Sequence, residues 1–278
     1  MTTATISAAD VNKLRQQTGS GMMDCKKALT EANGDFEAAI DILRKKGQKI
    51  AANRQDREAK EGYVFGKVTA DGTQGFVVAV CCETDFVAIN VDFVKYAESI
   101  LDLAMSKKPS TIDELKALTL GDRTVGETLI DQMGKIGEKI DVVDFQNVKS
   151  EKVIIYNHPG NKLTSLIAFN TTNQAVAEAG RDIAMQVAAM APVAIDKDDV
   201  DQSLLEREIE IAKEQIRAEG KPENMIEKIS AGKINKFYSE YTLLNQQFIK
   251  DEKKTVRQFL EGIDKNAHIT AMKRVKLG

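Results

Sequence analysis

Residues 63–82 read YVFGKVTADGTQGFVVAVCC, and this stretch decides how the middle of the chain folds. Apolar residues flank the dipeptide Asp71-Gly72, which is a common turn of β-hairpins. The pattern predicts strands at Tyr63–Val68 and Phe76–Cys82 that pair in an antiparallel hairpin. A long amphipathic helix is expected next, and Pro109 ends it.

The same order of elements returns further along the chain. Strands are expected at Val153–Tyr156 and Leu163–Phe169, with a turn at 158–161 between them and a long helix at Ala175–Met190 after them. Between the two copies the pattern predicts helices at Thr111–Leu118 and Thr124–Ile136 and a strand at Ile140–Val148. Strand, turn, strand and helix thus occur twice, which predicts an α+β core of two related subdomains with antiparallel sheets.

Segments of a different kind flank this core. Before it, three short helices are expected to form a small domain, with the third helix ending at Gly47 and a polar linker, itself able to be helical, at residues 49–62. After it, the highly charged residues 199–241 carry a narrow apolar stripe that Gly220-Lys221-Pro222 interrupts. This pattern predicts an inserted antiparallel, coiled-coil-like helical hairpin.

The sequence therefore predicts five segments. They are residues 1–55 (three-helix domain and linker), 56–140 and 141–198 (the two core subdomains), 199–245 (the hairpin insertion) and 246–278 (a short helix and a strand that returns to the second subdomain).

The composition excludes several function classes. The 278 residues carry 39 basic and 42 acidic side chains, and this balance argues against a protein that binds nucleic acid through its charge. The start, MTTATISAADVNK, has no apolar signal region, and no stretch is long and apolar enough to span a membrane. Three cysteines without a C-x-x-C motif are typical of reduced thiols. We expect a cytoplasmic protein without a metal or a cofactor.

Catalytic motifs are missing as well. The run Gly19–Asp24 begins like a dinucleotide-binding loop, but it lacks the third glycine and a preceding strand. The sequence contains no phosphate-binding loop, no nucleophile elbow and no H-E-x-x-H zinc motif. Cys25 lies beside two lysines at a helix start, which favours a lowered thiol pKa, but no base can be assigned to it. The sequence thus predicts a protein that is not an enzyme.

Two apolar signals need an explanation. Met22 and Met23 start a helix and point to different faces, so at least one of them is expected in the core, although methionine is also favoured at adaptable binding surfaces. Residues 83–88, ETDFVA, follow a strand. Their simplest interpretation is an ordinary helix start, in which Thr84 or Asp85 caps the helix and Phe86 packs against it.

These stretches together resemble a known family, bacterial elongation factor Ts. Leu14-Arg15 and residues 18–29, TGSGMMDCKKAL, are similar to its N-terminal signature, and ETDFVA is similar to its second signature. Lys135–Glu138 and Gly220–Pro222 follow in the expected order, and the resemblance covers most of the chain. It implies a ubiquitin-associated-like N-terminal domain, a two-part core and a helical hairpin. It also implies a guanine-nucleotide exchange factor that binds elongation factor Tu in its GDP-bound and nucleotide-free forms.

The resemblance also implies roles for individual residues. Asp85 and Phe86 would reach the magnesium region of the partner, where Phe86 wedges between two helices and Thr84 and Val87 frame the pair. Further implied contacts are Ile136 and His158 with the same GTPase domain, and Arg15, Met22 and Met23 with another face.

Alternatives stay open at this point. The residues also fit a non-exchange binding module, in which the N-terminal domain recognises a ubiquitin-like or nascent-chain partner and the hairpin drives oligomerisation. A cysteine-dependent enzyme that uses Cys25 is the least favoured class. A homodimer and a 2:2 complex with the partner are both possible. Some family members carry an additional helix after the last strand; here either its contact is dispensable or the basic tail at 273–276 replaces part of it.

Overall fold

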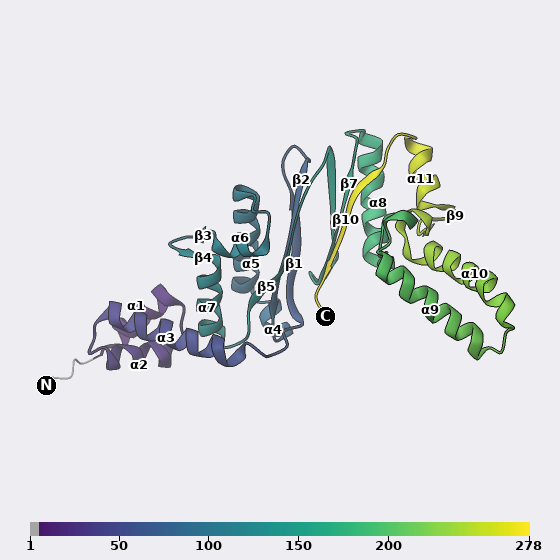
Figure 1. The fold of residues 1–278 in the computed structure, drawn as a ribbon. Coiled ribbons are helices and arrows are strands. Elements are labelled where there is room, and N and C mark those ends of the chain that lie inside the picture. The colour runs from purple at the N-terminus through teal and green to yellow at the C-terminus, as the bar shows by residue number, and fades with distance from the viewer. Residues whose placement is uncertain (1–5) are drawn as a thin grey trace. The chain divides into compact units, whose positions relative to one another are not determined.

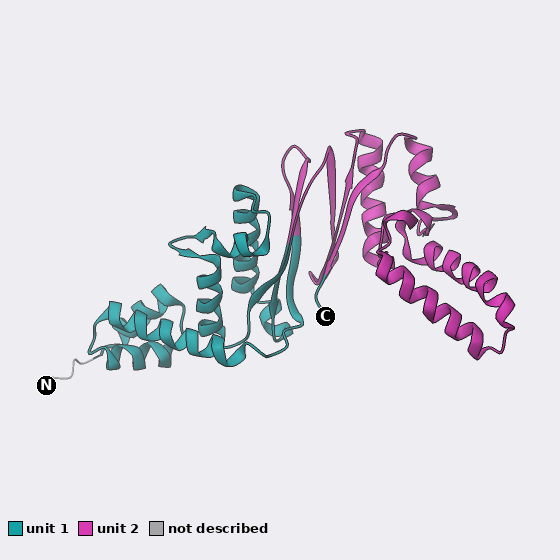
Figure 2. Cartoon of the chain, in the orientation of Figure 1, with its two compact units in different colours: residues 1–65, 78–145, 276–278 teal, residues 66–77, 146–275 magenta. Residues whose placement is uncertain are grey.

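The computed structural model describes residues 6–278 and combines helices with small antiparallel sheets, which confirms the predicted α+β class (Figure 1). The chain divides into two compact units (Figure 2). The first contains the residues up to 65, 78–145 and 276–278, and the second contains 66–77 and 146–275. The finer division into five segments stays a prediction, and residues 1–5 of its first segment lie outside the described part.

The first unit begins with the three expected helices, α1 (Ala8–Thr18), α2 (Met22–Glu31) and α3 (Phe36–Arg54). Ser7 and Asp10 form a capping box at the start of α1, and Asp35 caps α3. The apolar faces of the helices meet in a small core made of Val11, Leu14, Cys25, Ala28, Leu29 and Ala39. This core explains why so short a segment folds into a defined shape.

The prediction that α3 ends at Gly47 is wrong. The helix continues to Arg54 and packs along α7 (Val125–Ile136). A Cβ atom on Gly47 would lie 3.3 Å from the carbonyl oxygen of Ile130, and one on Gly134 would lie 2.8 Å from the Cα of Gly47. The two glycines therefore let two helix backbones approach closely, and Gly47 serves this crossing instead of ending the helix.

The rest of the first unit follows the predicted order, with two additions. The helices α5 (Val91–Lys107) and α6 (Ile112–Ala117) lie close to their expected bounds. The helix start expected at residues 83–88 forms a separate single-turn helix, α4 (Asp85–Ala88), and a short hairpin of β3 (Thr119–Leu120) and β4 (Arg123–Thr124) was not expected from the pattern. Three longer strands form one sheet, in the order β1 (Glu61–Val68), β2 (Gln74–Cys82) and β5 (Asp141–Lys149). Each of these strands has residues in both units.

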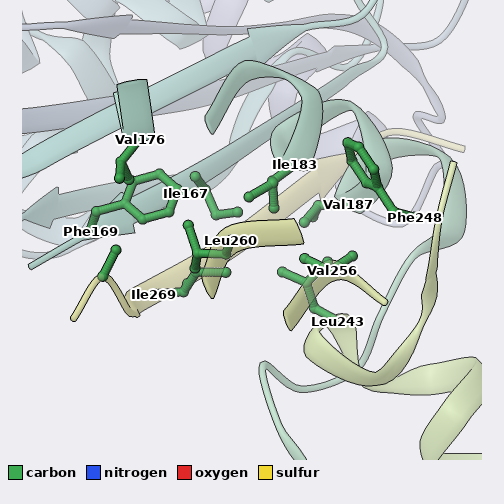
Figure 3. Packing of buried hydrophobic residues seen from close by; sticks show 11 residues of the cluster. Ile167, Phe169, Val176, Ile183, Val187, Leu243, Phe248, Val256, Leu260 and Ile269 are labelled. Carbon is green, nitrogen blue, oxygen red and sulfur yellow. The ribbon is translucent and has the colours of Figure 1, made fainter. Parts of the chain in front are cut away.

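The second unit is built on a three-stranded sheet and the helix α8 (Gln174–Met190). The strand β6 (Lys152–Asn157) pairs antiparallel with β7 (Leu163–Phe169), and β10 (Ile269–Lys276) lies on the other side of β7. Around these elements lie β8 (Gln247–Phe248), β9 (Asp251–Thr255) and α11 (Val256–Ile263). Their apolar side chains form one core with those of α8 and β7 (Figure 3): Ile167, Phe169, Val176, Ile183, Val187, Leu243, Phe248, Val256, Leu260, Ala267 and Ile269.

The predicted helical hairpin is present in the second unit. Its helices α9 (Gln202–Ala218) and α10 (Glu223–Tyr241) pack against each other, and Gly220 adopts a positive φ of 72° in the turn between them (Figure 1). At the base, the N–H of Val193 donates to the carbonyl of Tyr241 (2.8 Å) and that of Leu243 donates to the carbonyl of Ala194 (3.0 Å). The two chain ends of the insertion therefore lie side by side. Among the described residues, no helix is long and apolar enough to cross a membrane.

Candidate functional site

The most exposed aromatic side chain in the first unit lies on the connection between β2 and α5. Phe86, in the single turn of α4, is 80% exposed, and Ile89 and Val91 beside it are 76% and 64% exposed. The neighbouring Phe93 is buried and anchors the start of α5, where Asn90 caps the helix through hydrogen bonds from the N–H groups of residues 92 and 93. The connection therefore presents an apolar surface to solvent from a well-defined backbone.

The ordinary helix-start interpretation of residues 83–88 is confirmed for the position of the helix, because Thr84 occupies the N-cap of α4, but it is wrong for the side-chain contacts. Phe86 does not pack against the helix, and the Thr84 side chain does not cap α4. The Thr84 hydroxyl donates instead to Oε1 of Glu138 (2.6 Å), and the N–H groups of Glu83 and Thr84 both donate to Oε2 of the same carboxylate (3.1 and 3.0 Å). This side chain, from the segment after α7, thus holds the base of the loop.

A second apolar surface is formed by the start of α2. Gly19 ends α1 with a positive φ of 67°, and Gly21 precedes α2, so the chain reverses within a few residues. Cys25 lies on the buried face of α2, which turns Met22 and Met23 outward to exposed fractions of 55% and 64%. The expectation that one methionine belongs to the core is therefore wrong.

One groove brings these two surfaces together within the first unit. It has a volume of about 540 Å³ and lies between the turn after α1, the Phe86 loop and the last turn of α7. Its lining includes Arg15, Gly19, Ser20, Gly21, Met22, Phe86, Val87, Asn90, Asp92, Phe93, Gln132, Lys135 and Ile136. Five residues that the resemblance implies as partner contacts, separated widely in sequence, therefore share one surface.

The remaining predicted site residues lie elsewhere. Asp85 is exposed on the same loop, and its carboxylate accepts a hydrogen bond from the N–H of Phe86 (3.0 Å). Met23 is exposed beside the groove residue Met22, while Thr84 is turned toward Glu138. His158 belongs to the second unit, where its Nδ1 lies 3.1 Å from the hydroxyl of Tyr156.

Sequence reasoning missed four residues of this region. Ile89 and Val91 extend the exposed apolar surface. Glu83 and Glu138 fix the start of the loop through hydrogen bonds. The run Ile89-Asn90-Val91 carries a signal for the first pair, because two apolar residues flank a helix cap. The second pair depends on contacts between distant segments, which no local pattern reveals.

The thiols do not form a reactive centre. All three cysteines are free and buried, and the Cys25 thiol lies 3.6 Å from the carbonyl oxygen of Ser20. Burial raises the pKa of the Cys81 thiol, and burial together with the nearby Glu138 charge raises that of Cys82 to about 12. Within residues 6–278 there is no group of three or more metal-binding side chains. An exposed aromatic residue on a held loop, next to methionines, is instead typical of a surface that binds another protein.

Comparisons with known proteins agree with this class. The family model for elongation factor Ts matches residues 83–278. Among curated relatives, elongation factor Ts of Cytophaga hutchinsonii is 55% identical over 276 residues, which cover 99% of each chain. That of Flavobacterium psychrophilum is 48% identical over 99% of this chain and 100% of its own, and that of Amoebophilus asiaticus is 49% identical over 98% and 99%.

These matches place the chain in the class of translation proteins. The chain is a member of the elongation factor Ts family, and hence a translation elongation factor.

Proposed function

We propose that the protein is a guanine-nucleotide exchange factor for elongation factor Tu and acts in the cytoplasm without being an enzyme. It binds the GDP-bound partner, disturbs the magnesium and phosphate site, and leaves a nucleotide-free complex into which GTP can load. Membership of the elongation factor Ts family supports this proposal. A homodimer and a 2:2 complex are both compatible with it.

The observation that carries the proposal is the exposure of Phe86 on an anchored loop. Bound GDP is held by contacts to its phosphates and to Mg²⁺, the largest local charge at such a site. An apolar side chain that inserts nearby needs no chemical reactivity, because full burial of a phenylalanine contributes about 2–3 kcal/mol. The coupling is reciprocal. The protein lowers the affinity of elongation factor Tu for GDP by a certain ratio, and GDP lowers the affinity of elongation factor Tu for the protein by the same ratio.

The other predicted residues have supporting roles in this scheme. Asp85 lies beside Phe86 at the nucleotide site, with Thr84 and Val87 framing the pair. Ile136 contacts the GTPase domain, and Arg15, Met22 and Met23 dock on another face and hold the partner while Phe86 inserts. The His158 side chain, in the second unit, makes a separate contact with the GTPase domain.

The test is the rate at which fluorescent GDP leaves elongation factor Tu with and without the factor. Phe86→Ala should slow the accelerated release by roughly ten- to a hundredfold, equivalent to about 1.4–2.8 kcal/mol of lost contact in the transition state. Its melting temperature should change little because the side chain is exposed. Val143→Ala, which removes an exposed apolar residue on β5, serves as the matched control and should keep the full rate.

Two results would contradict the proposal. The first is no acceleration of GDP release at micromolar concentrations of the unaltered protein. The second is a Phe86→Ala variant that melts much earlier but still exchanges normally, since Phe86 would then be a core residue.

A further inference from the structure

The loop that presents Phe86 is held by a pair of carboxylates that act across two chain segments. Glu138, after α7, accepts three hydrogen bonds from Glu83 and Thr84. Glu83, after β2, accepts one in return from the N–H of Lys139, at 2.7 Å. Each segment thus satisfies backbone donors of the other, and we call these two side chains the carboxylate clasp.

The clasp also reaches the end of α3. Oε1 of Glu83 accepts a hydrogen bond from Arg54 at 2.6 Å, and Oε2 accepts one from Arg57 at 3.2 Å. The ammonium of Lys139 donates to the carbonyls of Gln55 and Arg57, at 2.6 and 2.9 Å. Gln55 is the C-cap of α3, and a cation at the carbonyl groups of a helix end stabilises that end. The helix that carries the N-terminal core is therefore bonded to the same cluster as the Phe86 loop.

The clasp is more than a surface ion pair. The Glu83 side chain is 15% exposed and that of Arg54 is 24% exposed, so solvent screens their attraction only in part. Hydrogen bonds to a charged group are about twice as strong as those between neutral groups. Three of them converge on Glu138 at the point where the chain leaves β2, two residues before Phe86.

On the basis of the proposed function, we infer that Glu138 and Glu83 are positioning residues for nucleotide exchange: they fix the backbone at residues 83 and 84 and so order the Phe86 loop before the partner arrives. A preformed loop avoids the entropy cost of ordering it at the moment of insertion. Because Arg54 binds the same clasp, the end of α3 is part of this preorganised unit.

The experiment compares Glu138→Ala with Glu138→Gln. The alanine variant leaves the two N–H groups and the Thr84 hydroxyl without their acceptor. Glutamine preserves the geometry, because its carbonyl accepts from both N–H groups and its NH₂ can donate to the Thr84 oxygen. We expect Glu138→Ala to lower the maximal rate of GDP release by roughly tenfold, with the half-saturating concentration changed much less, and Glu138→Gln to restore most of the rate.

A matched control removes a similar carboxylate from the other end of α7. Glu127 accepts hydrogen bonds from the N–H and the hydroxyl of Thr124 in a capping box. Glu127→Ala should destabilise the helix by a comparable amount but keep the maximal rate, because it leaves the clasp intact. A purely structural effect would reduce the amount of folded factor, and would raise the half-saturating concentration while the plateau stays.

Two further measurements make the result decisive. In a Phe86→Ala background, Glu138→Ala should slow exchange little further, since a residue that acts through Phe86 cannot add to its loss. In the free protein, hydrogen exchange of the amides of Glu83 and Thr84 should speed up in Glu138→Ala and stay slow in Glu127→Ala.

The outcomes separate this inference from the proposed function. If the unaltered protein accelerates exchange but Glu138→Ala keeps the full plateau, or adds its full effect to that of Phe86→Ala, the positioning role is wrong. If the unaltered protein does not accelerate exchange, the proposed function is wrong. The hydrogen-exchange measurement still tests whether the clasp orders the loop. Unchanged protection of the amides of residues 83 and 84 in Glu138→Ala would show that it does not.

Discussion

Glu83 holds its charge at a position that is largely closed to water. Burial alone would raise the pKa of this carboxyl, but the hydrogen bonds from the N–H of Lys139 and from Arg54 and Arg57 outweigh burial and lower the pKa below its ordinary value. A carboxyl with a lowered pKa in the folded state stabilises that state at all pH values above its unfolded pKa of about 4.3. This contribution disappears as the pH falls through the lower, folded value.

Glu83→Gln should therefore lower the free energy of unfolding at pH 7. The difference from the unaltered protein should shrink steadily below pH ~4, once the carboxylate of the parent is protonated as well. Urea unfolding at a series of pH values measures this directly. A difference that is independent of pH would mean that Glu83 contributes through shape and not through its charge.

The sequence predicted some residues of the site, but it did not predict how they are arranged. Phe86 and the two methionines could be selected from the sequence, because apolar residues beside turns stand out. Their exposure could not be predicted, since it depends on which face of α2 the buried Cys25 occupies and on where the loop is held. The carboxylate clasp could not be predicted from the sequence, because Glu83 and Glu138 are 55 positions apart in the chain.

At the level of elements, the crossing of α3 and α7 sets a limit on side-chain size. Gly134→Ala would place a methyl group 2.8 Å from the Cα of Gly47, which forces the helix backbones apart. We expect a loss of about 1–3 kcal/mol in the free energy of unfolding, as for other overpacked sites. Gly232→Ala, in the middle of α10 with open space around it, is the control and should gain roughly 0.4–1 kcal/mol.

Chemical denaturation of the two variants side by side tests this prediction. Equal effects of both substitutions would show that helix propensity alone decides, and that the crossing tolerates a methyl group.

The same crossing explains where element prediction failed. Hydrophobic periodicity located the long strands and helices, and it works because one face of each is buried. A glycine in a helical pattern is compatible with a helix end and with a close helix contact, and only the packing of Gly47 against α7 distinguishes the two. The hairpins of β3 with β4 and of β8 with β9 are too short to show a period.

For the whole molecule, the hairpin of α9 and α10 is the segment whose removal should disturb least. The carbonyls of Tyr241 and Ala194 accept the backbone hydrogen bonds that hold the two ends of the insertion together. Replacing residues 206–237, which lie between the two helix bases, by a short turn keeps these hydrogen bonds, so the core around Phe248 and Leu260 should stay folded, with a melting temperature close to that of the parent. On the proposed function, GDP release should reach the same maximal rate at a higher concentration of the factor.

Circular dichroism and a titration against elongation factor Tu check both parts. A collapsed maximal rate in a folded variant would show that the hairpin takes part in opening the nucleotide site and is more than an accessory arm.

The burial of all three thiols has a practical consequence for observing these steps. Cys25, Cys81 and Cys82 are each at most 1% exposed, so a maleimide dye should react very slowly with the thiols of the native protein. A single cysteine introduced at an exposed position, as in Ile89→Cys, would then be labelled selectively without removing any of the three natural cysteines. Such a dye, next to Phe86, would report in real time when the loop leaves water and enters its partner.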